Sequence, residues 1–235
     1  MSVGARLGIL GGTLDPVHVG HVETARAARH ALGLDRTLLV PSRVPPHRPT
    51  QPAASPFHRF AMTALAVNGI DGLEASDVEL TAPGTSYTAD TLDRFHAVGL
   101  RAAQIFFVLG ADAFAEIETW NRYPQVLDLA NFAVVSRPGY DTARLIEGIP
   151  ALAPRLARPG AIDGSGRFGT RIFLVSADTP DVSSTDIRRR LRTSMSIAGL
   201  VSSGVEQHIR QHALYRDGGS STYTRTAADH LHGQN

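Results

Sequence analysis

Short apolar runs alternate with stretches of helical periodicity along most of this chain of 235 residues. This alternation limits the possible folds more than any other feature of the sequence. Strands that are separated by helices are joined by βαβ crossovers, which build a parallel sheet with helices on both faces. No internal repeat and no linker interrupts the pattern. We therefore predict an α/β protein with a single doubly wound domain over residues 1–215.

Glycine, proline and helix-capping residues mark the ends of these segments. The predicted strands are Arg6–Leu10, Thr37–Val40, Leu73–Leu80, Gln104–Leu109, Phe132–Ser136 and Arg171–Val175. The predicted helices are Val19–Leu32, His58–Val67, Thr88–Val98, Asp112–Trp120, Pro124–Leu129, Ser184–Arg192 and Gly204–Leu214. This order is Rossmann-like. Ser42–Pro56 is predicted to be a proline-rich loop or lid, and Asp141–Thr170 fits a helix followed by a glycine-rich loop. Residues 216–235 are polar and are predicted to form a flexible tail.

Two missing residue types exclude whole classes of chemistry. Cysteine is absent, which excludes disulfides and thiol catalysis. Lysine is also absent, so all 23 residues counted as Lys or Arg are arginine. A Walker A loop and a Schiff-base enzyme both need a lysine. Phosphate charge must therefore be met by arginine, histidine, backbone N–H groups or a metal ion.

Charge and hydropathy limit the classes of binding partner that the sequence predicts. The net charge is +1, which predicts no nucleic-acid partner. No apolar run approaches the roughly 18 residues of a membrane span, and the N-terminal apolar core is too short for a secretory signal, so we expect no membrane partner and a cytoplasmic location. The oligomeric state is open, and a homo-oligomer is compatible with the sequence.

The first candidate site lies after the first predicted strand, at Gly11-Gly12. Glycines at the carboxyl end of a strand let a ligand approach the backbone, and the next helix offers unpaired N–H groups that suit phosphate. His18 and His21 are three residues apart and share one face of that helix. An ordinary turn with surface histidines is the alternative. A metal pair is disfavoured because no third ligand lies nearby, and no metal ligand is predicted.

The second candidate site follows the last predicted strand, in "VSSTDIRRRL" from Val182 to Leu191. Ser183 or Ser184 can cap this helix, and Asp186 suits its first turn. A plain capped helix is therefore one interpretation. Arg188, however, lies near the N-terminal end, where a cation gains nothing from the helix dipole. It should have another reason to be there.

Two motifs together indicate a family. "GGTLDPVHVGH" (Gly11–His21) resembles the HxGH signature of nucleotidyltransferases, and "SSTDIR" resembles their second signature, SSTxIR. The resemblance implies that His18, His21 and Arg188 are catalytic. By this likeness, the two histidines stabilise charge as the α-phosphorus of ATP is attacked, and Arg188 grips the β- and γ-phosphates together with Ser184 and Thr185. By the same resemblance, the residues that bind ATP are Gly11, Gly12, Thr13, His18, His21, Gly110, Asp112, Ser184, Thr185 and Arg188.

The middle of the chain resembles one branch of that superfamily, the bacterial nicotinate-mononucleotide adenylyltransferases. The matching segments are "PPHR", "TSYTADTL", "LGADAFAEIETW", "SRPGY" and "VEQHIRQHALY". The resemblance implies that ATP and nicotinate mononucleotide are the partners, that nicotinate adenine dinucleotide and pyrophosphate are the products, and that Mg²⁺ is the cofactor, bound mainly through ATP phosphates. The residues implied in binding nicotinate mononucleotide are Tyr87, Thr88, Trp120, Arg137, His47 and Arg48. Relatives usually have PPHK, so Arg48 stands in place of a lysine.

The residues themselves support these roles without requiring them. A helix that opens at Ser86–Thr88 can receive the carboxylate of a nicotinate ring, and Trp120 can stack on that ring. A simple helix cap and a core tryptophan are the alternatives. Glu79 is expected to be solvated, and His58, His208 and His212 receive no role.

Other functions stay open at this stage. Nicotinamide mononucleotide, phosphopantetheine and cytidylyl transferases share the HxGH corner, and a sensor that binds a nucleotide without turnover would share both motifs. Class I aminoacyl-tRNA synthetases also share HxGH, but their second signature needs a lysine, which this chain lacks.

Overall fold

The computed structural model describes residues 4–46, 52–136, 149–161 and 169–216. Its strands form one seven-stranded sheet in the order β3-β2-β1-β4-β5-β7-β6, and every pairing is parallel. The strands are β1 (Leu7–Gly12), β2 (Arg36–Pro41), β3 (Leu73–Ala75), β4 (Ile105–Gly110), β5 (Asn131–Ser136), β6 (Leu156–Ala157) and β7 (Ile172–Ser176). The prediction of a doubly wound parallel sheet is confirmed.

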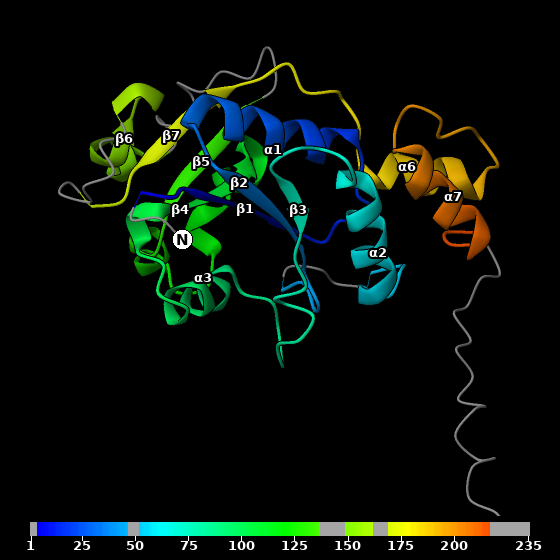
Figure 1. Cartoon of the computed structure of the whole chain (residues 1–235), viewed down its shortest axis with the longest axis horizontal. Helices are drawn as coiled ribbons and strands as arrows, with labels where there is room; N and C mark the ends of the chain where they lie inside the picture. Colours follow the sequence, from blue (N-terminus) through cyan, green and yellow to red (C-terminus); the bar gives the residue numbers. More distant parts are fainter. Residues whose placement is uncertain (1–3, 47–51, 137–148, 162–168, 217–235) are drawn as a thin grey trace, which may run out of the picture.

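Helices cover both faces of this sheet (Figure 1). The α-helices are α1 (Val19–Leu32), α2 (Pro56–Val67), α3 (Thr88–Ala97), α4 (Ala111–Ala115), α6 (Ser184–Arg192) and α7 (Ser203–Gln211). Short 3₁₀ helices lie at Ala102–Gln104, Ile117–Thr119, Gln125–Asp128, Pro150–Arg155 and Pro159–Ala161. None of the helices in the described ranges combines the length and apolar character needed to cross a bilayer.

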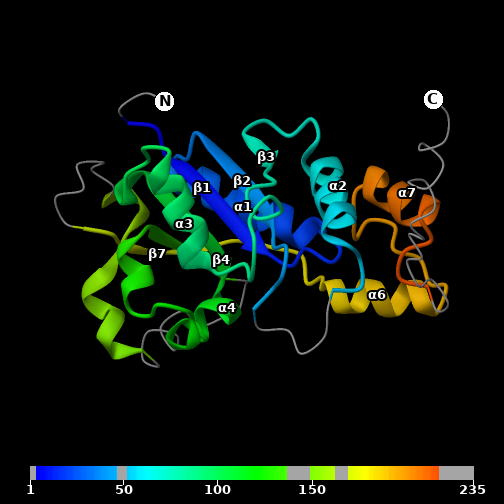
Figure 2. The same cartoon turned by 90° about the horizontal axis from the view of Figure 1, so that it is seen from below.

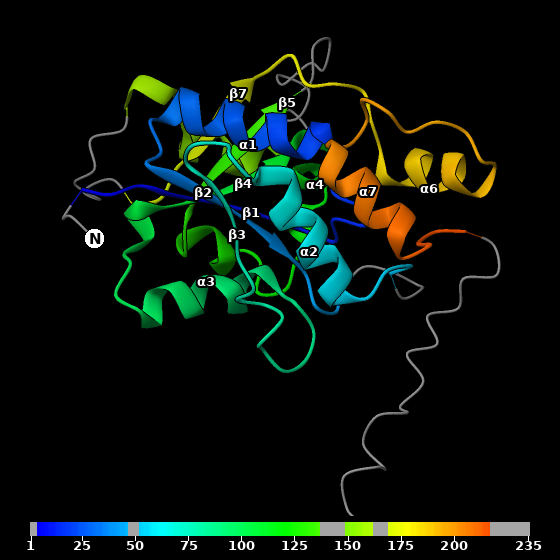
Figure 3. The ribbon, with the colours of Figure 1, turned by 45° about the vertical axis from the view of Figure 1, so that its right-hand side comes forward.

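Two apolar cores lie on the two faces, because successive residues of a strand point to opposite sides. In β4, Phe106 and Val108 belong to the core beneath α1, α2, α6 and α7, whereas Phe107 and Leu109 belong to the core beneath α3 and α4. Figure 2, seen from the α3 side, shows α6 and α7 beyond one end of the sheet. Figure 3 shows α7 alongside α2.

The first helix shows how local signals set an element. Helix α1 spans Val19–Leu32, as predicted, and Gly33 ends it in the left-handed conformation with φ 58°. Its buried residues include Val22, Ala25 and Leu32, which repeat at helical spacing. This stripe packs α1 on the sheet and fixes its first turn near the carboxyl end of β1.

Several predicted elements differ from the structure. Strand β1 does not end before Gly11-Gly12 but continues through them, and Gly12 pairs with Pro41 of β2. The expected strand Leu73–Leu80 stops at Ala75, because a turn follows in which the Leu80 N–H donates to the Asp77 carbonyl. The alternating pattern of that segment therefore extends beyond its strand.

The expected helix Asp112–Trp120 also divides. It forms α4 and then a 3₁₀ turn at Ile117–Thr119, which leaves Trp120 just beyond the turn. Phe114 and Ile117 are both buried, and their three-residue spacing suits the tighter 3₁₀ geometry. The expected helix Pro124–Leu129 is likewise a 3₁₀ turn, at Gln125–Asp128. In the described part of Asp141–Thr170, strand β6 was not predicted, and it lies between 3₁₀ turns at Pro150–Arg155 and Pro159–Ala161. Residues 217–235 and the rest of Asp141–Thr170 lie outside the described residues.

Gly8 tests the packing of β1 against β2. A Cβ at this position would lie 2.5 Å from Thr37 Oγ1 and 2.9 Å from Leu34 Cδ1, and Thr37 is fully buried. Gly8→Ala should therefore lower the free energy of unfolding by about 1–3 kcal/mol, measured by urea denaturation. Gly160→Ala, which adds its Cβ to open space, is the control. Equal stability of the two variants would contradict this account of the strand pair.

Candidate active site

Two cavities open at the carboxyl ends of β1 and β4, where the strand order reverses. Their volumes are about 610 and 450 Å³. Both are lined by Gly11, Leu109 and Ala113, so they adjoin. Ligands of open α/β sheets bind at such switch points. The arrangement can hold two ligands that meet beside Gly11.

The larger cavity has the histidine pair on its wall. The ring centroids of His18 and His21 are 3.7 Å apart, and both rings line the cavity. The His18 backbone N–H donates to Nδ1 of His21 at 3.2 Å, so a neutral His21 carries its proton on Nε2. A Cβ at Gly20 would lie 3.1 Å from two ring atoms of His18 and 3.4 Å from the Pro180 carbonyl oxygen. The glycine therefore allows the ring to fold over the start of α1.

The first turn of α6 forms another part of this wall. Ser183 is its N-cap, and its hydroxyl oxygen accepts the Asp186 N–H at 3.1 Å. Ser184 and Thr185 line the cavity. The Ser184 hydroxyl donates to the Pro16 carbonyl at 2.9 Å, which ties α6 to the loop before α1. The first turns of α1, α4 and α6 therefore all reach the larger cavity, and helix starts favour anions.

Arg188 lies one layer behind that wall. Its Nη1 donates to the Asp15 carbonyl at 2.6 Å, and its Nη2 donates to Thr185 Oγ1 at 3.2 Å. The described lining of the larger cavity includes His18, His21 and Thr185 but not Arg188. The structure therefore brings the histidine pair and the start of α6 together in one cavity wall. Arg188 is outside that wall and bonds to Thr185, which is part of it.

Asp15 is a site residue that the sequence reasoning did not single out. Its carboxylate is 1% exposed and accepts the backbone N–H groups of Ala53 and Ala54 at 2.8 and 3.1 Å. It also accepts the Tyr215 hydroxyl at 2.8 Å. Burial, followed by the Asp15 charge, raises the pKa of Tyr215, so that hydroxyl stays protonated as a donor. Asp15 thus joins the loop before α1 to residues 53–54 and to the segment after α7.

Arg59 is the second residue that was missed. It is fully buried and donates to the carbonyls of Thr13, Arg43 and Ala54 at 2.7, 3.2 and 3.2 Å. A sequence signal existed, because Arg59 falls on the same helical face as the buried Met62, Thr63 and Ala66. A cation on an apolar stripe needs partners, and here it fixes three loops around the cavities.

The smaller cavity contains the aromatic residues predicted for the mononucleotide. Tyr87, Thr88 and Trp120 all line it, and the Trp120 ring lies edge-on to Phe107 at 5.8 Å. Tyr87 is the N-cap of α3 but makes no capping bond through its side chain. The cavity therefore combines a helix start, which can receive an anion, with an aromatic ring.

Glu79 corrects a prediction. It was expected to be solvated, but it is 7% exposed and lines the smaller cavity. Thr91 Oγ1 donates to its Oε1 at 2.7 Å. Burial raises the pKa of Glu79, and hydrogen bonds from Thr91 and Ser86 oppose that rise only in part. Glu79 is thus bonded to Thr91 of α3.

The other predicted ligands divide between the cavities. Gly110 and Asp112 line the larger one, as expected for ATP contacts. A Cβ at Gly110 would lie 2.5 Å from Asp112 Oδ1, so the glycine makes room for that carboxylate. Gly12 and Thr13, also predicted for ATP, line the smaller cavity instead. His47, Arg48 and Arg137 lie outside the described residues.

Comparison with known proteins identifies the family of the chain. Residues 9–190 match the model of the cytidylyltransferase-like family. The chain therefore belongs to the nucleotidyltransferases of that family, and its curated relatives define the branch. It is 39% identical over 217 residues to the probable nicotinate-nucleotide adenylyltransferase of Desulfatibacillum aliphaticivorans, covering 89% of this chain and 99% of that protein. A Roseiflexus sp. RS-1 protein of the same name is 39% identical over 214 residues, covering 90% and 98%.

The particular family is the nicotinate-nucleotide adenylyltransferases, to which this chain belongs. The fold agrees with a solved structure of Plasmodium falciparum nicotinic acid mononucleotide adenylyltransferase complexed with NaAD. That structure superposes with a TM-score of 0.68 at 16% identity, covering 90% of this chain and 97% of the other.

The buried Glu79 predicts a pH-dependent stability. A carboxyl whose pKa is raised by folding contributes most to folding stability at pH values below its unfolded pKa. That stability is lost as the pH rises through the folded pKa. Glu79→Gln removes this loss. Relative to wild type, the variant should gain free energy of unfolding as pH rises from 4.5 to 8, by at most about 1.4 kcal/mol per pH unit.

Urea denaturation at several pH values measures this difference. Glu116→Gln is the matched control, because Glu116 lines the same cavity but is exposed. A parallel change in Glu116→Gln, or none in Glu79→Gln, would show that the burial of Glu79 has no such effect.

Proposed function

We propose that this chain transfers the adenylyl group of ATP to nicotinate mononucleotide, which yields nicotinate adenine dinucleotide and pyrophosphate, a step of NAD biosynthesis. The observation that carries the proposal is the pair of cavities that adjoin at Gly11. One is built from imidazoles and helix starts, which suits a triphosphate. The other is built from a helix start and Trp120, which suits a pyridine carboxylate. The family membership of the chain supports the same reaction.

The chemistry is a direct in-line displacement. A phosphate oxygen of the mononucleotide forms a bond to the α-phosphorus of ATP, and the bond from that phosphorus to the bridging oxygen of pyrophosphate breaks. The attacking oxygen is already anionic at neutral pH, so the step needs no general base. The protein has to hold two polyanions in line and offset their repulsion.

The larger cavity supplies that offset. His18 and His21 lie at the start of α1, and the first turn of α6 lines the same cavity. These donors are held before the ligand arrives, so they cost little reorganisation during the reaction. Arg188 supports this wall through its hydrogen bonds to Thr185 and to the Asp15 carbonyl. Its direct contact with the β- and γ-phosphates stays a prediction.

The smaller cavity selects the acceptor. The N–H groups at the start of α3 favour the carboxylate of the nicotinate ring over a neutral amide. Trp120, held edge-on to Phe107, offers its face for stacking on the pyridinium. The acid form of the substrate therefore gains more from this cavity than its amide counterpart.

Mg²⁺ fits this site chiefly as a partner of the phosphates. Asp112 is the only carboxylate among the described residues that line the larger cavity, so no cage of acidic ligands is available. Mg²⁺ binds readily through one carboxylate, several waters and substrate phosphates. When bound, the ion would offset the negative charge of the phosphate oxygens during transfer. Asp112, as the carboxylate of this lining, would contact the water shell of the bound ion.

A pyrophosphate-release assay with a panel of acceptors tests the proposed reaction. ATP would be combined separately with nicotinate mononucleotide, its amide counterpart, phosphopantetheine and glycerol phosphate. We expect the highest kcat/KM with nicotinate mononucleotide. Faster turnover of another acceptor would move the chain to another substrate, and the absence of turnover with all four would favour a nucleotide sensor.

His18→Ala tests the charge-stabilising role of the pair. Loss of one preorganised donor should lower kcat by about 10²–10³-fold with a smaller change in KM for ATP. His30→Ala is the control, because His30 is exposed near the other end of α1. Thermal unfolding of both variants checks that the fold persists. A kcat close to wild type in folded His18→Ala would remove the imidazole from the mechanism.

Trp120→Ala tests the stacking surface. Its loss should raise KM for nicotinate mononucleotide by about 10-fold, since an aromatic contact of this kind is worth roughly 0.5–1.5 kcal/mol beyond its buried area. The KM for ATP should change little, because Trp120 does not line the larger cavity in the described structure. Trp120→Phe should restore most of the loss. An equal rise in both KM values would contradict the assignment.

A further inference from the structure

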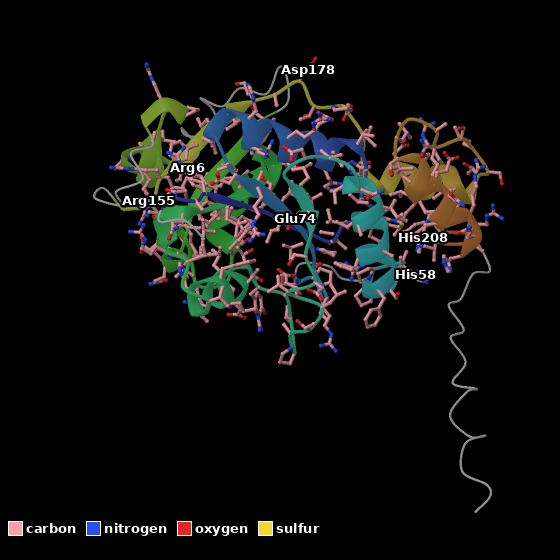
Figure 4. All side chains as sticks on the ribbon, in the orientation of Figure 1. Arg6, His58, Glu74, Arg155, Asp178 and His208 are labelled. Carbon is pink, nitrogen blue, oxygen red and sulfur yellow. The ribbon has the colours of Figure 1, made fainter. Side chains whose placement is uncertain are left out.

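Three histidines meet outside both cavities, where α2 lies alongside α7. His58 is in the first turn of α2, His208 is in α7, and His212 caps the end of α7. Nδ1 of His58 and Nε2 of His208 are 3.0 Å apart, and one ring nitrogen from each of the three residues lies within 4.8 Å of the others. Figure 4 shows His58 and His208 side by side at this junction.

We propose that His58, His208 and His212 form a binding site for a divalent transition metal such as Zn²⁺, which joins α2 to α7. Imidazole nitrogens are preferred ligands of Zn²⁺, Cu²⁺ and Ni²⁺, whereas Mg²⁺ prefers oxygen. The site is therefore distinct in chemistry and in place from the phosphate-bound Mg²⁺ of the proposed reaction.

The geometry is close to that of a coordinated ion. Two nitrogens bound to tetrahedral Zn²⁺ at about 2.0–2.1 Å lie roughly 3.3 Å apart, and the observed His58–His208 pair is near that value. His208 and His212 are four residues apart, and the His212 N–H donates to the His208 carbonyl at 3.1 Å, so the two rings share one helical face. His212 is exposed, which leaves its ring room to turn toward the pair.

The environment also suits a metal. Burial, followed by the nearby His212, lowers the pKa of both His58 and His208. Neutral imidazole is the form that binds metals. Helix α7 ends at His212, and the partial negative charge at a helix C-terminus favours a cation there.

A metal at this position would act on the fold near the active site. His58 precedes Arg59, which holds the Thr13 carbonyl. His212 lies three residues before Tyr215, which donates to Asp15. The ion would therefore fasten together the two helices whose neighbouring residues anchor the loop before α1. It would stabilise that loop without touching the substrates.

The test uses the full chain after chelator treatment and dialysis, with Co²⁺ and Zn²⁺ as probes. We expect Co²⁺ to give the intense visible absorption of a tetrahedral site with one ion per chain. Zn²⁺ at about 100 times its Kd should raise Tm by about 5–10 °C. His208→Gln and His212→Gln should each lower the Zn²⁺ affinity by at least about 100-fold.

Two controls isolate the cluster. His30→Gln changes an exposed histidine elsewhere, and His230→Gln with His232→Gln removes two histidines outside the described residues; both variants should bind Zn²⁺ like wild type. Tm of each metal-free variant reports whether it folds. The proposal is overturned if no Co²⁺ spectrum appears, which would leave a His58–His208 hydrogen bond alone. It is also overturned if binding survives His208→Gln and His212→Gln but is lost with the His230 and His232 changes.

Discussion

The buried carboxylate of Asp15 is the interaction on which the nucleotide corner depends. A carboxylate that is 1% exposed is costly unless it is well bonded. Its partners come from residues 53–54 and from Tyr215, and Arg188 lies nearby with its Nη1 3.9 Å from Oδ2. Since each partner belongs to a different segment, the charge holds the loop before α1 in one place. His18 follows Asp15 by three residues, so the same bonds also fix the position of the histidine pair.

The absence of lysine helps to explain which groups are available to bind phosphate. In the proposed reaction, phosphate charge would be met in the described residues by two imidazoles and the starts of α1, α4 and α6, while arginines such as Arg59 and Arg188 bond to loop carbonyls. The neighbouring cavity has a different electrostatic character, because it includes the buried Glu79. A raised pKa lets Glu79 lose its charge more easily, which in the proposed complex would limit repulsion beside a pyridine carboxylate.

Local signals explain what could be predicted. Helix Val19–Leu32 was predicted to the residue because its apolar stripe and Gly33 are adjacent in sequence. The strand expected at Leu73–Leu80 was too long, because its alternating pattern continues past Ala75 into a turn. The same alternation cannot show that Glu79 bonds to Thr91, twelve residues away. The histidines of α2 and α7 are 150 residues apart. Their meeting follows from the packing of the two helices and leaves no pattern in the sequence.

The hydrogen bond between Tyr215 and Asp15 spans 200 residues, and the one between Arg188 and Asp15 spans 173. A ribosome delivers Asp15 long before either partner exists. During synthesis the carboxylate therefore remains exposed to water, and the loop around it lacks these two bonds until Arg188 and Tyr215 have been made. Native contacts of such long range slow folding. The corner around Asp15, although translated before Arg188 and Tyr215, is completed only after them.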